Sequence, residues 1–256
     1  MYALALAARL SWSDYVAVYP PRVYLATTLP RAVLQVAFLT YLGYYAGGVA
    51  GREFAFIGAC AQVIVIATVV RGADVLLDDR FQDTIHRLRL GVLSLPAVIA
   101  ARWWVYIAEG TAEALVAAAV VGPLLGEADE LGRLFAAAPL FLLVAVTTSA
   151  LGLTAAALSL TQRADVLITN LLGYLTVVAC GVVAPLSSLG PVGSEVARAL
   201  PLTNGLLAIR DVVGGGAWLG DAALEAGVGA AWLAVGVLLL ELQTRRSRRL
   251  GTDEQL

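Results

Sequence analysis

The chain has 256 residues, of which 60% are hydrophobic and only 14% are charged, and its mean hydropathy is +0.82. A soluble domain carries about 25% charged residues, so this composition excludes a soluble protein and indicates a membrane protein. The formal net charge is −2, which leaves no basic face for binding nucleic acid.

The first 30 residues are expected to form a helix at the membrane surface. This stretch is too short and too polar to cross a membrane, and it lacks the basic region of a signal peptide. Trp12, Tyr15 and Tyr19 are aromatic residues of the kind enriched at headgroup depth. We therefore assign residues 1–30 to an interfacial, elbow-like helix.

Six stretches are apolar over a length that can cross a membrane, which takes about 20 residues for about 30 Å of hydrocarbon. They cover residues 32–50, 54–70, 103–125, 134–161, 166–186 and 226–240. Placing both termini in the cytoplasm puts most of the arginines on the cytoplasmic side, as the positive-inside rule favours. The sequence therefore predicts an all-α membrane protein of six transmembrane helices. We expect a single domain over residues 1–256 in the plasma (inner) membrane.

Four glycines lie near the outer end of the first predicted span. They are Gly43, Gly47, Gly48 and Gly51. Small residues let helices approach closely in membranes, and a dimer seam is one place where such an approach would occur.

A charged segment, residues 78–92, separates the second and third spans. Its ions cannot lie in lipid, so we expect a cytoplasmic surface helix there. Asp79, Asp83 and Arg87 recur at helical spacing and would form a polar face. His86 is the only histidine, and the sequence supplies no partners for a catalytic or metal site around it. The alternative for the segment is an ordinary amphipathic connector that contacts no partner.

Two carboxylates lie within the third span. Glu109 and Glu113 are four residues apart and share one helix face. Intramembrane carboxylates usually face a bundle interior or an aqueous cavity. They would either form an anionic lining or proton-linked site in a substrate path, or pair with arginines from elsewhere in the bundle. Gln35 and Asn170 are further candidates for the path, although such residues more often form hydrogen bonds between helices.

The connection at residues 187–221 is longer than a simple loop. It is moderately apolar, and Pro191, Pro201 and the glycines at 214–216 interrupt it. Irregular backbone at membrane depth is tolerated where it packs on protein or lines a cavity. We therefore predict short re-entrant helices on the outer side before the last span.

Three segments resemble a known family in the expected order. Asp79-Arg80-Phe81-Gln82-Asp83-Thr84-Ile85-His86-Arg87-Leu88 resembles the E-R-x-x-G-T-L-E-x-L segment of type-2 ABC exporter permeases. Leu29-Pro30-Arg31-Ala32-Val33-Leu34-Gln35 resembles the start of the family's first span. The run from Leu200-Pro201-Leu202-Thr203 to Arg210 is similar to the n-P-L-T segment before its sixth span. Asp83 and His86 depart from the pattern, because the family has Gly and Glu there.

The resemblance implies a permease subunit that is not itself an enzyme. It implies a separate soluble ATPase subunit, which would hold ATP and Mg²⁺, and a second permease copy as a homodimer. The chain has no P-loop, and we expect it to bind no cofactor. The cytoplasmic helix would couple to the ATPase subunit through Asp79, Arg80, Asp83, Thr84, Ile85, His86, Arg87 and Leu88.

The family implies export of an amphiphilic, lipid-like or drug-like substrate across the plasma membrane. The alternative from another class is an ion- or proton-coupled carrier that uses Glu109 and Glu113 without an ATPase. An intramembrane enzyme would need several convergent catalytic groups at one depth, and the single histidine makes that class a poor match.

Overall fold

The structure is a computed structural model that describes residues 2–81, 95–159 and 165–250. Every regular element within these residues is helical. The elements are α1 (Tyr2–Val18), α2 (Pro21–Val23), η1 (Tyr24–Thr28), α3 (Leu29–Val65), η2 (Ile66–Arg71), α4 (Gly72–Phe81), α6 (Leu95–Leu125), η3 (Ala128–Glu130), α7 (Leu131–Ala136), α8 (Ala138–Ser159), α9 (Asp165–Ala179), η4 (Leu186–Leu189), α10 (Gly190–Arg198), α11 (Thr203–Gly214) and α12 (Leu219–Leu250). Here η1 and η2 are π-helical, whereas η3 and η4 are 3₁₀ turns.

Among the described residues, four helical stretches are long and apolar enough to cross a membrane. They are Pro21–Leu77, Ala97–Leu125, Ala138–Ser159 and Leu219–Gln243, and the shorter stretch Leu167–Ala179 of α9 is also apolar. The prediction of an all-α, multi-pass membrane protein is therefore confirmed. The number of crossings, six, stays a prediction.

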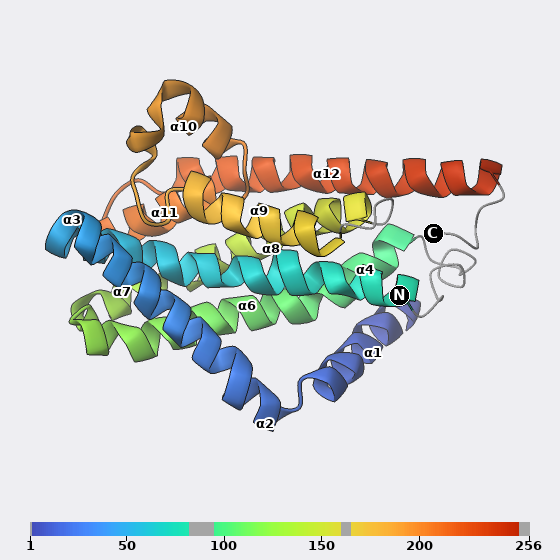
Figure 1. The fold of residues 1–256 in the computed structure, drawn as a ribbon, viewed down its shortest axis with the longest axis horizontal. Helices are drawn as coiled ribbons and strands as arrows, with labels where there is room; N and C mark the ends of the chain where they lie inside the picture. Colours follow the sequence, from blue (N-terminus) through green and yellow to red (C-terminus); the bar gives the residue numbers. More distant parts are fainter. Residues whose placement is uncertain (1, 82–94, 160–164, 251–256) are drawn as a thin grey trace.

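The longest stretch, Pro21–Leu77, is a helical hairpin. Its 57 residues would extend for roughly 85 Å as a straight helix, far more than a membrane is thick. Gly47 (φ −143°, ψ 19°) and Gly48 (φ 64°, ψ −145°) leave the helical conformation, and the chain turns back there (Figure 1). The positive φ of Gly48 favours glycine. The first two predicted spans fall on the two limbs.

The limbs of this hairpin touch at two further glycines. A Cβ atom at Gly43 would collide with Ala55 and with the Gly51 carbonyl, and one at Gly51 would collide with Gly43. The glycines thus do allow close helix approach. The contact that Gly43 and Gly51 permit lies between the limbs of α3, and an approach across a dimer seam stays a prediction.

Helix α8 occupies the middle of the bundle (Figure 1). It contacts α3, α4, α6, α9, α11 and α12. Its buried side chains, among them Phe141, Val144 and Leu151, join Phe56 and Ile64 of α3 in the main apolar core. Helix α8 is buried on nearly all sides, as expected of the charge-free apolar stretch that it occupies.

Several boundaries differ from those predicted. The predicted fourth span is divided at Ala137 into α7 and α8. The predicted fifth span continued to residue 186, but α9 ends at Ala179, and Gly181 follows with a φ of 74°. Apolar residues such as Val182 continue past the helix end, so hydropathy alone does not locate it. The predicted sixth span is lengthened to α12.

The elements next to the last span match the prediction of short helices there. Turn η4 and helices α10 and α11 lie between α9 and α12, and α10 projects from the bundle (Figure 1). At the start of the chain, α1 packs on α6, where Trp12 stacks on Trp104 with ring centroids 6.0 Å apart. The Ser11 hydroxyl also donates to the Arg102 carbonyl at 2.9 Å.

Candidate functional site

Two arginines and two glutamates from distant parts of the chain form a buried ion cluster. Arg71, the last residue of η2, donates from Nη1 to Glu109 Oε1 at 2.5 Å and from Nη2 to Glu113 Oε1 at 3.0 Å. Arg31, at the start of α3, donates to Glu113 Oε2 at 3.1 Å and to Gln35 Oε1 at 3.0 Å. We call Arg31, Arg71, Glu109 and Glu113 the ion cluster.

The ion cluster is balanced in charge and mostly buried, with Arg31, whose side chain is 35% exposed, at its edge. The side chains of Glu109 and Glu113 are 3% and 0% exposed, and that of Arg71 is 10% exposed. A buried ion needs a partner of opposite sign, and here each carboxylate has at least one guanidinium. The π-helical η2 presents Arg71 to the face that Glu109 and Glu113 share on α6, and such π-helical segments are frequent at functional sites.

The interfacial helix α1 also reaches the ion cluster. The Tyr15 hydroxyl donates to Glu109 Oε1 at 2.5 Å, and burial, aided by that carboxylate, raises the pKa of the Tyr15 phenol. The Arg71 guanidinium carbon lies 5.8 Å from the centroid of the Tyr19 ring, a cation–π distance. A polar pocket of about 280 Å³ between α1, α4 and α6 leads to Arg71. Helix α1 is thus hydrogen-bonded to α6 at the ion cluster.

The structure brings three of the four predicted path residues together. Gln35, Glu109 and Glu113 are joined through the arginines, whereas Asn170 lies half-buried on α9. The interpretation that the carboxylates pair with arginines is confirmed. A role of these residues in a substrate path stays a prediction.

The predicted coupling residues fall at the edge of the described chain. Asp79 lies on α4 and accepts a hydrogen bond from Arg102 Nη1 of α6 at 2.5 Å. Arg80 also lies on α4. The remaining coupling residues lie outside the described residues; they are Asp83, Thr84, Ile85, His86, Arg87 and Leu88. The described helices α4 and α6, which flank this segment, are therefore tied together by Asp79 and Arg102.

A buried carboxylate on α12, Glu225, was not predicted as a site residue. It is fully buried and accepts hydrogen bonds from the backbone N–H groups of Leu202 at 2.8 Å and Gly205 at 2.9 Å. The Thr147 hydroxyl of α8 donates to it at 2.5 Å. Glu225 therefore satisfies the free N–H groups at the start of α11. The sequence feature that could have indicated this role is the position of Glu225, an acidic residue directly before the last apolar stretch.

Arg210 of α11 also has a role that its sequence context did not reveal. Its Nη2 donates to the carbonyls of Phe54 at 3.1 Å and Gly181 at 2.8 Å, and its guanidinium stacks on the Phe54 ring at 3.4 Å. None of the residues that the structure describes offers it a carboxylate within ion-pair distance, and burial lowers the pKa of the Arg210 guanidinium. The segment from Leu200 to Arg210 thus locks the ends of α9, α11 and α12 together.

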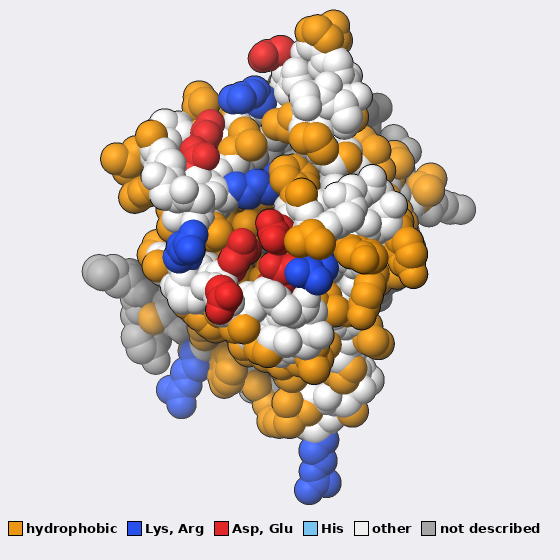
Figure 2. Space-filling model, turned by 90° about the vertical axis from the view of Figure 1, so that its left-hand side faces the viewer, with side chains coloured by type: hydrophobic (Ala, Val, Ile, Leu, Met, Phe, Trp, Pro, Cys, Tyr) orange, Lys and Arg blue, Asp and Glu red, His pale blue; other side chains and the backbone are white. Residues whose placement is uncertain are grey.

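Charged side chains gather at the end of the bundle where α3 turns. Figure 2 views this end and shows acidic and arginine side chains near its middle, surrounded by hydrophobic ones. One ion pair here joins Arg52 Nε of α3 to Glu127 Oε1 at 2.5 Å, and the Glu127 carboxylate is almost fully buried. Asp129 and Glu130 of η3 follow it in the sequence.

Apolar helices of membrane-crossing length, packed around a charge-balanced ion cluster, define a multi-pass membrane protein. The chain belongs to the ABC-2 type transporter family, whose sequence model matches residues 7–213. The match includes all three segments that carry the resemblance and ends before α12. Members of this family are the membrane components of ABC transporters, which implies an ATPase partner and no enzymatic activity of the component itself. Comparisons with curated proteins and with solved structures returned no match.

Proposed function

We propose that this protein is the transmembrane permease subunit of an ATP-driven export complex in the plasma membrane. The observation that carries the proposal is the connection between the predicted coupling segment and the ion cluster. Helix α4, which leads into that segment, follows directly after Arg71, and α6, which leaves it, carries Glu109 and Glu113. A force on the segment would act on both sides of the ion cluster.

The proposed mechanism begins on the partner subunit, which binds ATP and Mg²⁺. Closure of two such ATPase subunits would push on residues 78–92. The Asp79–Arg102 pair and the hydrogen bond from Trp103 Nε1 to the Thr68 carbonyl, at 3.1 Å, hold α4, η2 and α6 together. These helices would therefore tilt as one body and open the outer side to an amphiphilic, lipid-like or drug-like substrate.

The proposed topology has six crossings with both termini in the cytoplasm. The two limbs of the α3 hairpin supply the first two crossings, and α6, α8, α9 and α12 supply the others. Residues 1–30 would lie at the membrane surface and residues 187–221 on the outer side. A second copy of the chain completes the complex in this proposal, because the family resemblance implies two permease subunits.

The ion-coupled carrier is the weaker hypothesis. A carrier of that kind would need Glu109 or Glu113 to exchange protons or bind cations during transport. Both carboxylates are instead held by arginines and lie in a nearly dry interior. Proton-dependent transport by the isolated protein in liposomes, with no ATPase present, would favour the carrier and refute the export complex.

The proposal is tested by purifying the chain together with a candidate ATPase subunit and measuring ATP hydrolysis over a panel of lipids and drugs. We expect a stable complex whose ATPase rate rises with a transported amphiphile. Asp83→Ala and Arg87→Ala should abolish that stimulation, whereas Arg22→Ala, an exposed residue of α2, should not. Unchanged stimulation of ATP hydrolysis in the two segment variants would show that residues 78–92 do not couple.

A further inference from the structure

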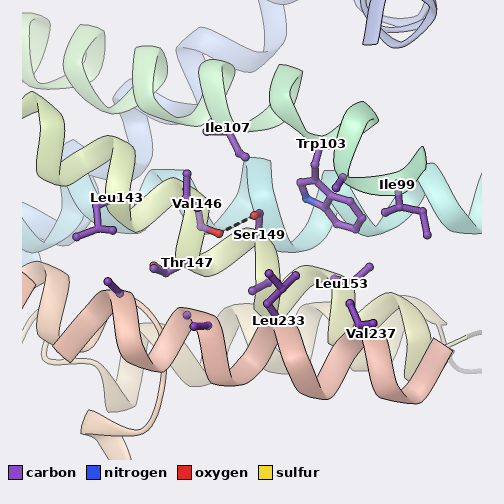
Figure 3. Close-up of a pocket in the computed structure, with 15 residues that line it drawn as sticks. Ile99, Trp103, Ile107, Leu143, Val146, Thr147, Ser149, Leu153, Leu233 and Val237 are labelled. Atoms are coloured by element: carbon purple, nitrogen blue, oxygen red, sulfur yellow. Dashed lines mark hydrogen bonds between the residues drawn. The ribbon is translucent and has the colours of Figure 1, made fainter. Parts of the chain in front are cut away.

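A long apolar groove runs between α6, α8 and α12 (Figure 3). Its volume is about 410 Å³, within the range of small-molecule binding sites. Trp103 of α6, Leu153 of α8 and Leu233 of α12 are among the large side chains that line it. Small residues on α12, including Gly229 and Ala230, leave the space open.

The chemistry of the groove suits a hydrocarbon. The described residues that line it include no charged side chain. Its two hydroxyls are already used, because Ser149 donates to the Val146 carbonyl at 2.6 Å (Figure 3) and Thr147 donates to Glu225. A polar ligand would lose its hydration here without gaining hydrogen bonds, whereas an apolar ligand would lose nothing.

The dimensions of the groove suit one acyl chain. Its walls extend over residues 99–107 of α6, 143–153 of α8 and 226–237 of α12, which is roughly 12–17 Å at the rise of an α-helix. That length is about half of the 30 Å hydrocarbon core, or one leaflet.

The groove opens onto exposed apolar side chains of two helices that are long enough to cross a membrane. Val146 and Leu233, which line it, are 48% and 47% exposed, and each belongs to a helix long enough to cross the membrane. The neighbours available at such a surface are the chains of the surrounding lipid. We propose that the groove is a binding site for one acyl chain of a membrane phospholipid.

A lipid chain bound in the groove would affect the packing of α4, the helix that leads to the coupling segment. Trp103 is only 3% exposed, and its ring leaves no room for a Cβ atom at Gly72 of α4. Its Nε1 is fixed on the carbonyl of Thr68, in η2. A chain in the groove would therefore hold α6 against η2 and α4. This consequence for coupling rests on the proposed function, whereas binding of the chain does not.

Tryptophan quenching tests the binding directly. The other tryptophans are replaced by Phe, which leaves Trp103 as the sole emitter, and phosphatidylcholine with one brominated acyl chain is titrated into the detergent-solubilised protein. Bromine quenches on contact, so we expect a saturable loss of Trp103 emission at low lipid content. Emission that stays constant, or that falls only in proportion to the bulk lipid, would overturn the proposal.

Paired variants on α12 separate the groove from the general lipid surface. Ala230→Phe fills the groove, and Ala231→Phe places the same ring on the exposed side of α12 outside the lining. In Ala230→Phe the acyl chain should lose contact with the groove over about two methylenes, which should weaken its apparent affinity about tenfold. The affinity of Ala231→Phe should equal that of the parent. Equal affinities in the two folded variants would refute the site. If Ala230→Phe does not elute as a folded protein, Ala226→Leu in the same lining replaces it.

A second measurement keeps the proposed function distinguishable from the lipid site. ATP hydrolysis by the complex with its ATPase subunit should depend on phospholipid in the parent and in Ala231→Phe, and less so in Ala230→Phe. Quenching that saturates without any ATPase partner would support the lipid site while the export function failed. ATPase stimulation without quenching would support the export function and refute the lipid site.

Discussion

Removing Arg71 should destabilise the protein more than removing any exposed arginine. The guanidinium pairs with Glu109 and Glu113, and all three side chains are at most 10% exposed. Each pair at about 4 Å between charge centres is worth about 4 kcal/mol at an effective dielectric constant of 20. Desolvation opposes this attraction, so the pairs add little net stability while they are intact.

The loss appears when one partner is removed alone. Arg71→Met leaves the ion cluster with one uncompensated negative charge, and breaking a buried pair in this way costs about 3–5 kcal/mol. For a chain of this size that corresponds to a fall of roughly 6–20 °C in apparent Tm. The assay is thermal unfolding of the detergent-solubilised protein, followed by circular dichroism. Arg22→Met, at an exposed arginine of α2, is the matched control and should shift stability by at most about 0.5 kcal/mol.

A double variant distinguishes lost charge balance from lost packing. Arg71→Met with Glu109→Gln removes one charge of each sign, so it should recover most of the stability that Arg71→Met loses. Strictly additive losses in the double variant would refute the argument from charge balance. A loss below about 1 kcal/mol in Arg71→Met would show that the carboxylates do not depend on this guanidinium.

Four further outcomes follow from the described contacts. Glu225→Gln should cost about 1–3 kcal/mol and speed hydrogen exchange at the start of α11, because one oxygen no longer accepts a backbone N–H; unchanged exchange would contradict the capping role. Arg210→Lys should cost a similar amount in thermal unfolding, since Lys lacks the planar fork and stacks poorly; parent-like stability would argue against the stacking. Tyr15→Phe should release α1 to added protease without unfolding the spans, and equal cleavage rates would show that its bond to α6 is dispensable. Cys60 and Cys180, 0% and 1% exposed, should react with maleimide only after unfolding; labelling of the folded protein would contradict their burial.

The membrane-crossing helices could be predicted because apolar length is a local property. A run of about 20 apolar residues is visible without knowledge of its neighbours. The end of α9 could not be located in this way, because Val182 and Val183 continue the apolar run beyond Gly181. Whether a glycine ends a helix or continues it depends on what packs around it, and hydropathy does not carry that information.

The ion cluster could be predicted only in part. The spacing of Glu109 and Glu113 shows that they share a helix face, and their intramembrane position predicts partners. The identity of those partners depends on contacts with Arg71, 38 residues away from Glu109, and with Arg31, 82 residues away from Glu113. Glu225 illustrates the same limit, because the backbone groups that it caps lie more than a helix away in sequence.

The hairpin reversal at Gly47 and Gly48 also constrains how the chain enters a membrane during synthesis. Because only a short turn at Gly47 and Gly48 separates the two limbs, one limb cannot insert into the bilayer while the other stays in the aqueous phase. The limbs must partition as a pair, and in the proposed orientation they carry Arg52 to the far side. The partner of Arg52, Glu127, is made 75 residues later. In the proposed topology the Arg52–Glu127 pair would form only after α6 has followed the hairpin into the membrane, and it would then join the first three proposed crossings.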